Sequence, residues 1–74
     1  MWINVYDQYG YCIKTFEANS EEEVIRGVKN ASGLSQEASM EYALRYEEFK
    51  TEPEAISAAF IADDQSREYY STKY

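Results

Sequence analysis

The chain has 74 residues, with 14 acidic and 7 basic side chains and a formal net charge of −7. This length predicts a single domain, residues 1–74, with no room for a second core. One cysteine and no histidine argue against an internal disulfide, a zinc site of the usual Cys/His type and histidine-dependent catalysis. The acidic balance argues against direct binding of nucleic acid or of anionic membranes.

Hydrophobic residues make up 45% of the chain and aromatic residues 16%, which predicts a folded rather than a disordered protein. The longest apolar run, Ala58 to Ala62, is too short to span a membrane, and residues 1–4 lack the pattern of a secretion signal. The single Cys12 fits a reducing compartment, so we expect a cytoplasmic protein.

The first eighteen residues predict two antiparallel strands. Residues 2–6 and 11–16 are rich in aromatic and β-branched side chains. Between them, Asp7 suits the first position of a tight turn and Gly10 the last.

A helix is predicted to follow, from Ser20 to about Asn30. The Ser20 hydroxyl and the Glu23 carboxylate form a capping-box pattern. Val24 and Val28 recur at helical spacing, and residues 32–33 are expected to end the helix.

Residues 35–50 allow two interpretations, because they contain fair helix formers but residues 40–46 alternate as a strand does. An offset of 31 residues aligns residues 11–14 with residues 42–45 and residues 20–25 with residues 51–56. This internal similarity favours a strand, a capping box and a helix used twice. The alternative is an all-helical second half.

The second helix is predicted to begin at Thr51 and Pro53, since proline is tolerated in a first turn. Ile56, Ala59, Phe60 and Asp63 then share one side of it. The helix could stop near Asp64, but we favour continuation to about Tyr70. The predicted fold is α+β, a β-β-α-β-α domain with a three-stranded, mainly antiparallel sheet and both helices on one face.

No motif indicates an enzyme, a cofactor or a metal site. The carboxylates lack the spacing of a calcium loop, the serines have no base to activate them, and the glycines form no phosphate-binding loop. The acids of residues 21–23, 52 and 54 are explained as helix N-termini. Other acids are in surplus, and eight tyrosines are more than a small core can bury, which suggests a protein-binding surface. The predicted partner-binding residues are Glu41, Glu47, Glu48, Glu52, Glu54, Asp63, Asp64, Glu68, Tyr42, Tyr46, Tyr69 and Tyr70.

The size, the charge, the absence of histidine and the acidic clusters at residues 21–23, 47–48, 52/54 and 63–64 resemble a class of small acidic phage and mobile-element proteins. These are the DNA-mimic inhibitors of the anti-restriction and anti-CRISPR type. The resemblance implies stoichiometric inhibition of a nucleic-acid-binding protein, with carboxylates standing in for phosphates. Seven basic residues spread through both halves depart from a continuous acidic stripe.

The sequence therefore predicts a non-enzymatic protein that inhibits or modulates a basic nucleic-acid-handling partner, such as a restriction or CRISPR effector complex. Two alternatives remain: a homodimeric structural or assembly protein with a tyrosine-rich interface, and a regulator that docks on RNA polymerase. The first hypothesis predicts that reversing Glu47, Glu48, Asp63 and Asp64 to lysine abolishes binding and preserves the fold.

Overall fold

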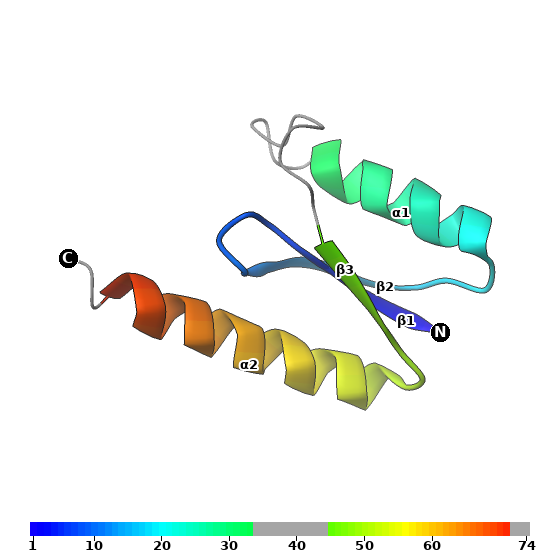
Figure 1. Ribbon diagram of the computed structural model, residues 1–74. Coiled ribbons are helices and arrows are strands. Elements are labelled where there is room, and N and C mark those ends of the chain that lie inside the picture. Colours follow the sequence, from blue (N-terminus) through cyan, green and yellow to red (C-terminus); the bar gives the residue numbers. More distant parts are fainter. Residues whose placement is uncertain (34–44, 72–74) are drawn as a thin grey trace.

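A computed structural model describes residues 1–33 and 45–71, which form three strands and two helices (Figure 1). In chain order these are β1 (Trp2–Tyr6), β2 (Cys12–Glu17), α1 (Glu21–Gly33), β3 (Arg45–Phe49) and α2 (Glu52–Ser71). The strand order is β2-β1-β3, and β1 pairs antiparallel with both neighbours. The predicted α+β class, element order and antiparallel sheet are confirmed.

The turn between β1 and β2 is closed by backbone hydrogen bonds between Asp7 and both Gly10 and Tyr11, and by the Asp7 side chain. The Asp7 carboxylate accepts hydrogen bonds from the backbone N–H groups of Tyr9 (2.9 Å) and Tyr11 (3.0 Å). Gly10 has a φ of 88°, in the left-handed region that favours glycine. A Cβ at Gly10 would also lie 2.6 Å from the Ser66 hydroxyl of α2. The predicted turn residues thus have both a local and a tertiary function.

Both helices use the predicted capping hydroxyls, while the Glu23 carboxylate accepts from the backbone N–H of Asn19 at 2.6 Å rather than from that of Ser20. The backbone N–H of Glu23 donates to the Ser20 hydroxyl at 3.2 Å. In α2 the backbone N–H of Glu54 donates to the Thr51 hydroxyl at 3.4 Å, and that hydroxyl donates to the Glu54 carboxylate at 3.0 Å. Each half of the chain therefore has a strand followed by a capped helix.

The element bounds differ only slightly from those predicted. Helix α1 extends to Gly33 rather than to about Asn30, and α2 ends at Ser71, one residue beyond the predicted Tyr70. Residues 45–49 are a strand, so the all-helical alternative is wrong there. The predicted strand residues 40–44 lie outside the described part of the chain.

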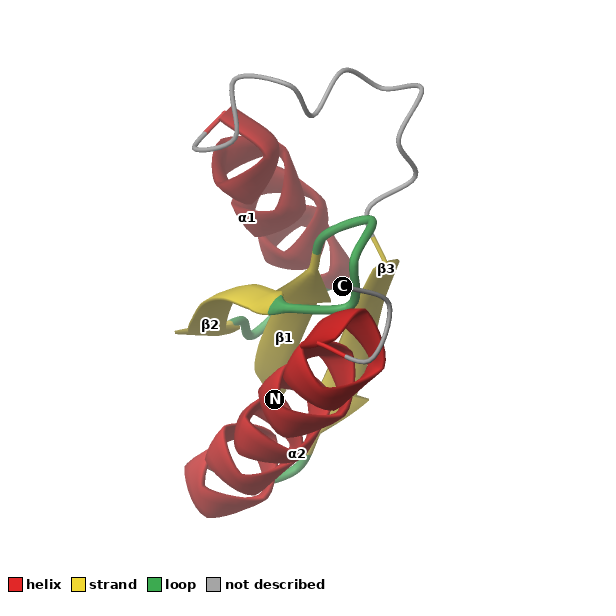
Figure 2. Cartoon of the chain, turned by 90° about the vertical axis from the view of Figure 1, so that its left-hand side faces the viewer, coloured by secondary structure: helices red, strands yellow, loops and turns green. Residues whose placement is uncertain are grey.

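The two helices pack on opposite faces of the sheet, which corrects the expected placement on one face. Ile3 and Val5 of β1 form a core cluster with Val24 and Ala31 of α1. The alternate residue Asn4 faces the other side, where its amide donates to the backbone carbonyl of Ala55 in α2 at 2.7 Å. Figures 1 and 2 agree, with α1 above and α2 below the sheet. Strand β1 is therefore buried on both faces.

Candidate interaction surface

Three of the tyrosines gather where the β1–β2 turn meets the end of α2. The Tyr70 ring packs edge-to-face on Tyr9 (centroids 5.4 Å apart) and on Tyr69 (5.0 Å). Such pairs add stability beyond the area they bury. Tyr70, one of the predicted partner-binding residues, therefore also holds α2 against the turn, and Tyr69, another of them, packs on Tyr70.

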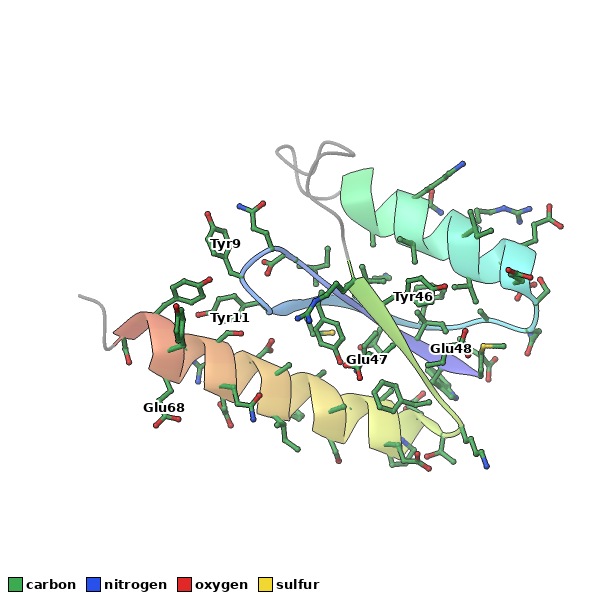
Figure 3. The ribbon with its side chains drawn as sticks, viewed as in Figure 1. Tyr9, Tyr11, Tyr46, Glu47, Glu48 and Glu68 are labelled. Carbon is green, nitrogen blue, oxygen red and sulfur yellow. The ribbon has the colours of Figure 1, made fainter. Side chains whose placement is uncertain are left out.

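The paired acids Glu47 and Glu48 lie on opposite faces of the sheet. They pair with Asn4 and Ile3 respectively, and adjacent strand residues point to opposite sides. Glu47 faces α2 beside the Tyr6 hydroxyl. Burial raises the pKa of Tyr6, a hydrogen bond from Asn4 lowers it, and the Glu47 carboxylate raises it. Both acids belong to the edge strand β3 (Figure 3), but they do not form one acidic site.

Two of the predicted partner-binding acids of α2 have structural roles. The Asp63 carboxylate accepts a hydrogen bond from the backbone N–H of Cys12 at 2.8 Å, which ties α2 to the start of β2. The Glu54 carboxylate accepts a hydrogen bond from the Thr51 hydroxyl in the cap of α2. Neither side chain is therefore a simple surface charge.

The remaining acids of α2 share a ridge with apolar side chains. Residues four apart are neighbours along a helix surface, and such rows form its ridges. The ridge, hereafter the α2 ridge, consists of Glu52, Ile56, Phe60, Asp64 and Glu68. Its centre is apolar and its ends are acidic, and Glu68 points away from the sheet (Figure 3).

The apolar centre of the α2 ridge is unusually open to solvent. Phe60 is 66% exposed and Ile56 is 40% exposed, and the adjacent Ile61 is 57% exposed. The only ion pair found on the ridge in residues 45–71 joins Asp64 to Arg67 at 3.4 Å, with both side chains exposed, and such pairs contribute little. Sequence reasoning placed Ile56 and Phe60 on one helix side but did not identify them as a binding surface. The available signal was that apolar residues of α2 occur on every side of the helix.

A shallow groove lies between the α2 ridge and strand β2. One wall is the side of α2 predicted from the sequence. The groove is lined by Ile56, Ala59, Phe60 and Asp63 of α2 and by residues 12–15 of β2. The sequence-predicted grouping of the four α2 residues is thus confirmed, and it faces the edge of the sheet.

The sheet has an edge strand on each side, and the hydrogen-bond pattern shows which backbone groups point outward. Met1 and Ala18 exchange two backbone hydrogen bonds, each 2.9 Å long. Since such pairs alternate along an antiparallel ladder, Thr15 and Glu17 turn their backbone groups away from β1. By the same alternation, Tyr46 and Glu48 of β3 face outward on the other side. None of these four has a strand partner within residues 1–33 and 45–71.

The predicted sites at Glu41 and Tyr42 lie outside the described residues. Tyr46 is 48% exposed on β3, away from the tyrosines at the end of α2. Those of the predicted partner-binding residues that lie in the described ranges are therefore distributed over β3 and α2, and only Glu52, Asp64 and Glu68 among them share the α2 ridge.

Among residues 1–33 and 45–71, no group of three or more potential metal ligands comes together. Nor is any helix in those ranges both long and apolar enough to cross a membrane. Comparisons with protein-family models, curated proteins and solved structures found no match to this chain.

Proposed function

We propose that this protein is a non-enzymatic cytoplasmic inhibitor that covers the nucleic-acid-binding surface of a basic partner, such as a restriction or CRISPR effector complex. The observation that carries the proposal is the α2 ridge, in which exposed Asp64 and Glu68 adjoin exposed Phe60, on a chain with a net charge of −7.

The ridge combines the two features that such binding requires. Carboxylates one helical turn apart, about 5 to 6 Å, present negative charge to lysine and arginine side chains that otherwise contact phosphates. Phe60 and Ile61 supply an apolar centre from which water can be expelled, the usual arrangement of protein interfaces. On binding, a lysine or arginine of the partner would replace Arg67 in its weak ion pair with Asp64.

The variants that test this proposal must avoid acids that support the fold. Reversing Asp63 would remove the acceptor of the Cys12 N–H, and reversing Glu47 would place a cation beside buried Tyr6. The fourfold reversal suggested by the sequence therefore confounds binding with folding. Asp64→Asn combined with Glu68→Gln removes only exposed carboxylates.

The experiment is a pull-down from lysate with the tagged full chain at low salt and at roughly 0.5 M salt. We expect capture of a basic nucleic-acid-handling protein that is lost at high salt and displaced by that protein's own nucleic acid. Asp64→Asn/Glu68→Gln should reduce capture about tenfold, corresponding to about 1.4 kcal/mol.

The matched control is Glu21→Gln/Glu22→Gln, which removes the same charge from the start of α1 and should leave capture within about twofold. Equal losses in both variants would show that net charge alone acts. If no nucleic-acid-handling protein is captured at low salt, the proposal is wrong. Capture of RNA polymerase would instead identify the regulator that the sequence also allows.

A second candidate, the homodimer, is favoured by one observation on β3. A two-fold axis at Tyr46 would pair the outward backbones of two copies and place Arg45 opposite Glu47 of the second copy. Tyr46, 48% exposed, would lie at the centre. Sedimentation equilibrium separates the candidates, since the inhibitor proposal expects a monomer and the β3 pairing a dimer that Tyr46→Lys disrupts.

A further inference from the structure

The outer edge of β2 presents backbone groups that can pair with another strand. The backbone groups of Thr15 and Glu17 point away from β1 and have no strand partner among the described residues. An unpaired edge of this kind is a template for an extended peptide, which supplies the missing main-chain hydrogen bonds. The Thr15 side chain already makes a hydrogen bond within the protein, because its hydroxyl donates to the Asn4 amide oxygen at 2.7 Å. Only its backbone is left for a ligand.

Helix α2 provides a side wall for that edge. Asp63 fixes α2 to β2 through the Cys12 N–H, and Ile56 and Phe60 line the groove with residues 12–15. A strand added to β2 would project alternate side chains toward α2. Those side chains would contact Phe60, whose ring is now largely in water.

We propose that this groove binds an extended peptide segment of the partner protein, added as a fourth strand beside β2, with an apolar side chain against Ile56 and Phe60 and basic side chains on either side of it. The inference rests on the proposed function for the class of partner and specifies how that partner is held.

The basic character of the segment follows from the charges around the groove. The α2 ridge carries Glu52 before its apolar centre and Asp64 and Glu68 after it. Glu17 adds a carboxylate on the α2 side of the sheet, since it pairs with Trp2, two residues from Asn4. Lys14 also lines the groove, but it pairs with Val5, so its side chain belongs to the α1 face, where it lies near Phe16 and Gly27. Lysine or arginine side chains of the bound peptide would therefore lie near carboxylates at both ends of the apolar centre.

The test is a nuclear magnetic resonance titration of the isotopically labelled full chain with the heptapeptide Thr-Lys-Thr-Val-Thr-Lys-Thr, hereafter the lysine–valine peptide, whose valine and two lysines share one face of a strand. We expect the largest amide shifts at Thr15 and Glu17 of β2 and at Ile56 and Phe60 of α2. Phe60→Ala should weaken binding about tenfold. The matched control is Ile25→Ala on α1, which truncates another exposed apolar residue, 51% exposed, and should leave binding within about twofold.

Two further peptides separate strand addition from simple charge attraction. N-methylation of alternate backbone amides removes donors but keeps the charge, and should weaken binding about tenfold. The same peptide with glutamate in place of both lysines should not bind. Three results would each contradict peptide binding in this groove. They are failure of the lysine–valine peptide to bind, undiminished binding of the N-methylated peptide, and amide shifts confined to β3 or α1.

The outcomes also distinguish the groove from the proposed function. If a basic partner is captured and Phe60→Ala leaves its capture unchanged, the inhibitor proposal holds and the proposal that the groove binds the partner is wrong. If the peptide binds as expected but no nucleic-acid-handling protein is captured, the groove stands and the inhibitor proposal is wrong.

Discussion

Asn4 is the residue on which the packing of three elements depends. Its side chain is completely buried. The amide nitrogen donates to the Ala55 carbonyl at 2.7 Å and to the Tyr6 hydroxyl at 3.2 Å, and the amide oxygen accepts from Thr15. A buried amide is tolerated only when it is hydrogen-bonded. Asn4 thereby joins β1 to both β2 and α2.

Replacing Asn4 with alanine is predicted to lower the free energy of unfolding by about 2 to 4 kcal/mol, because the Thr15 and Tyr6 hydroxyls lose their partner and a cavity remains. Thr15→Val keeps the bond to Ala55 and should cost about 1 kcal/mol. Urea unfolding followed by circular dichroism measures both. Equal effects of the two substitutions would show that the Asn4–Ala55 bond contributes nothing.

At the scale of elements, what the sequence predicted correctly depended on short-range interactions. The Asp7 turn and the Ser20–Glu23 cap connect residues at most four positions apart, so their residue types are sufficient evidence. The face of the sheet that each helix covers could not be predicted from such short-range interactions. They depend on Asn4 being satisfied by Ala55, 51 positions away.

The same limit applies to the candidate site. Asp63 looked like a surface acid because its partner, the Cys12 N–H, is equally distant in the chain. Helical spacing placed Phe60 on one side of α2 with Ile56, but spacing does not show that both side chains line a groove beside β2 and remain exposed.

The docking of α1 gives a prediction at this scale. Gly27 lies against the Phe16 ring, and a Cβ at Gly27 would collide with that ring. Gly27→Ala should therefore destabilise the protein by about 1 to 3 kcal/mol from overpacking, although alanine alone favours a helix by about 1 kcal/mol. Thermal unfolding measures the loss. The double variant Gly27→Ala/Phe16→Leu should be more stable than Gly27→Ala alone; if it is not, the ring contact is not the cause.

Over the whole molecule, the carboxylates act in two opposing ways. Those that accept hydrogen bonds within the protein stabilise the fold, as Asp7, Asp63 and Glu54 do with backbone or hydroxyl donors. The exposed ones, such as Asp64 and Glu68, add to a net charge of −7, and like charges on a small surface repel one another. The surface proposed to attract a basic partner therefore lowers the stability of the free protein.

Salt should consequently affect folding and binding in opposite directions. Raising sodium chloride from about 20 mM to about 300 mM screens exposed charges more strongly than buried contacts. We expect the melting temperature of the free chain to rise by about 4 to 8 °C, corresponding to about 1 kcal/mol for a domain of this size, while capture of the partner weakens. Asp64→Asn/Glu68→Gln should start with a higher melting temperature at low salt and gain less from added salt, because two repelling charges are gone. A melting temperature that falls with salt in the unaltered chain would show that attractive pairs and helix caps outweigh the repulsion, and that the exposed carboxylates do not destabilise the free protein.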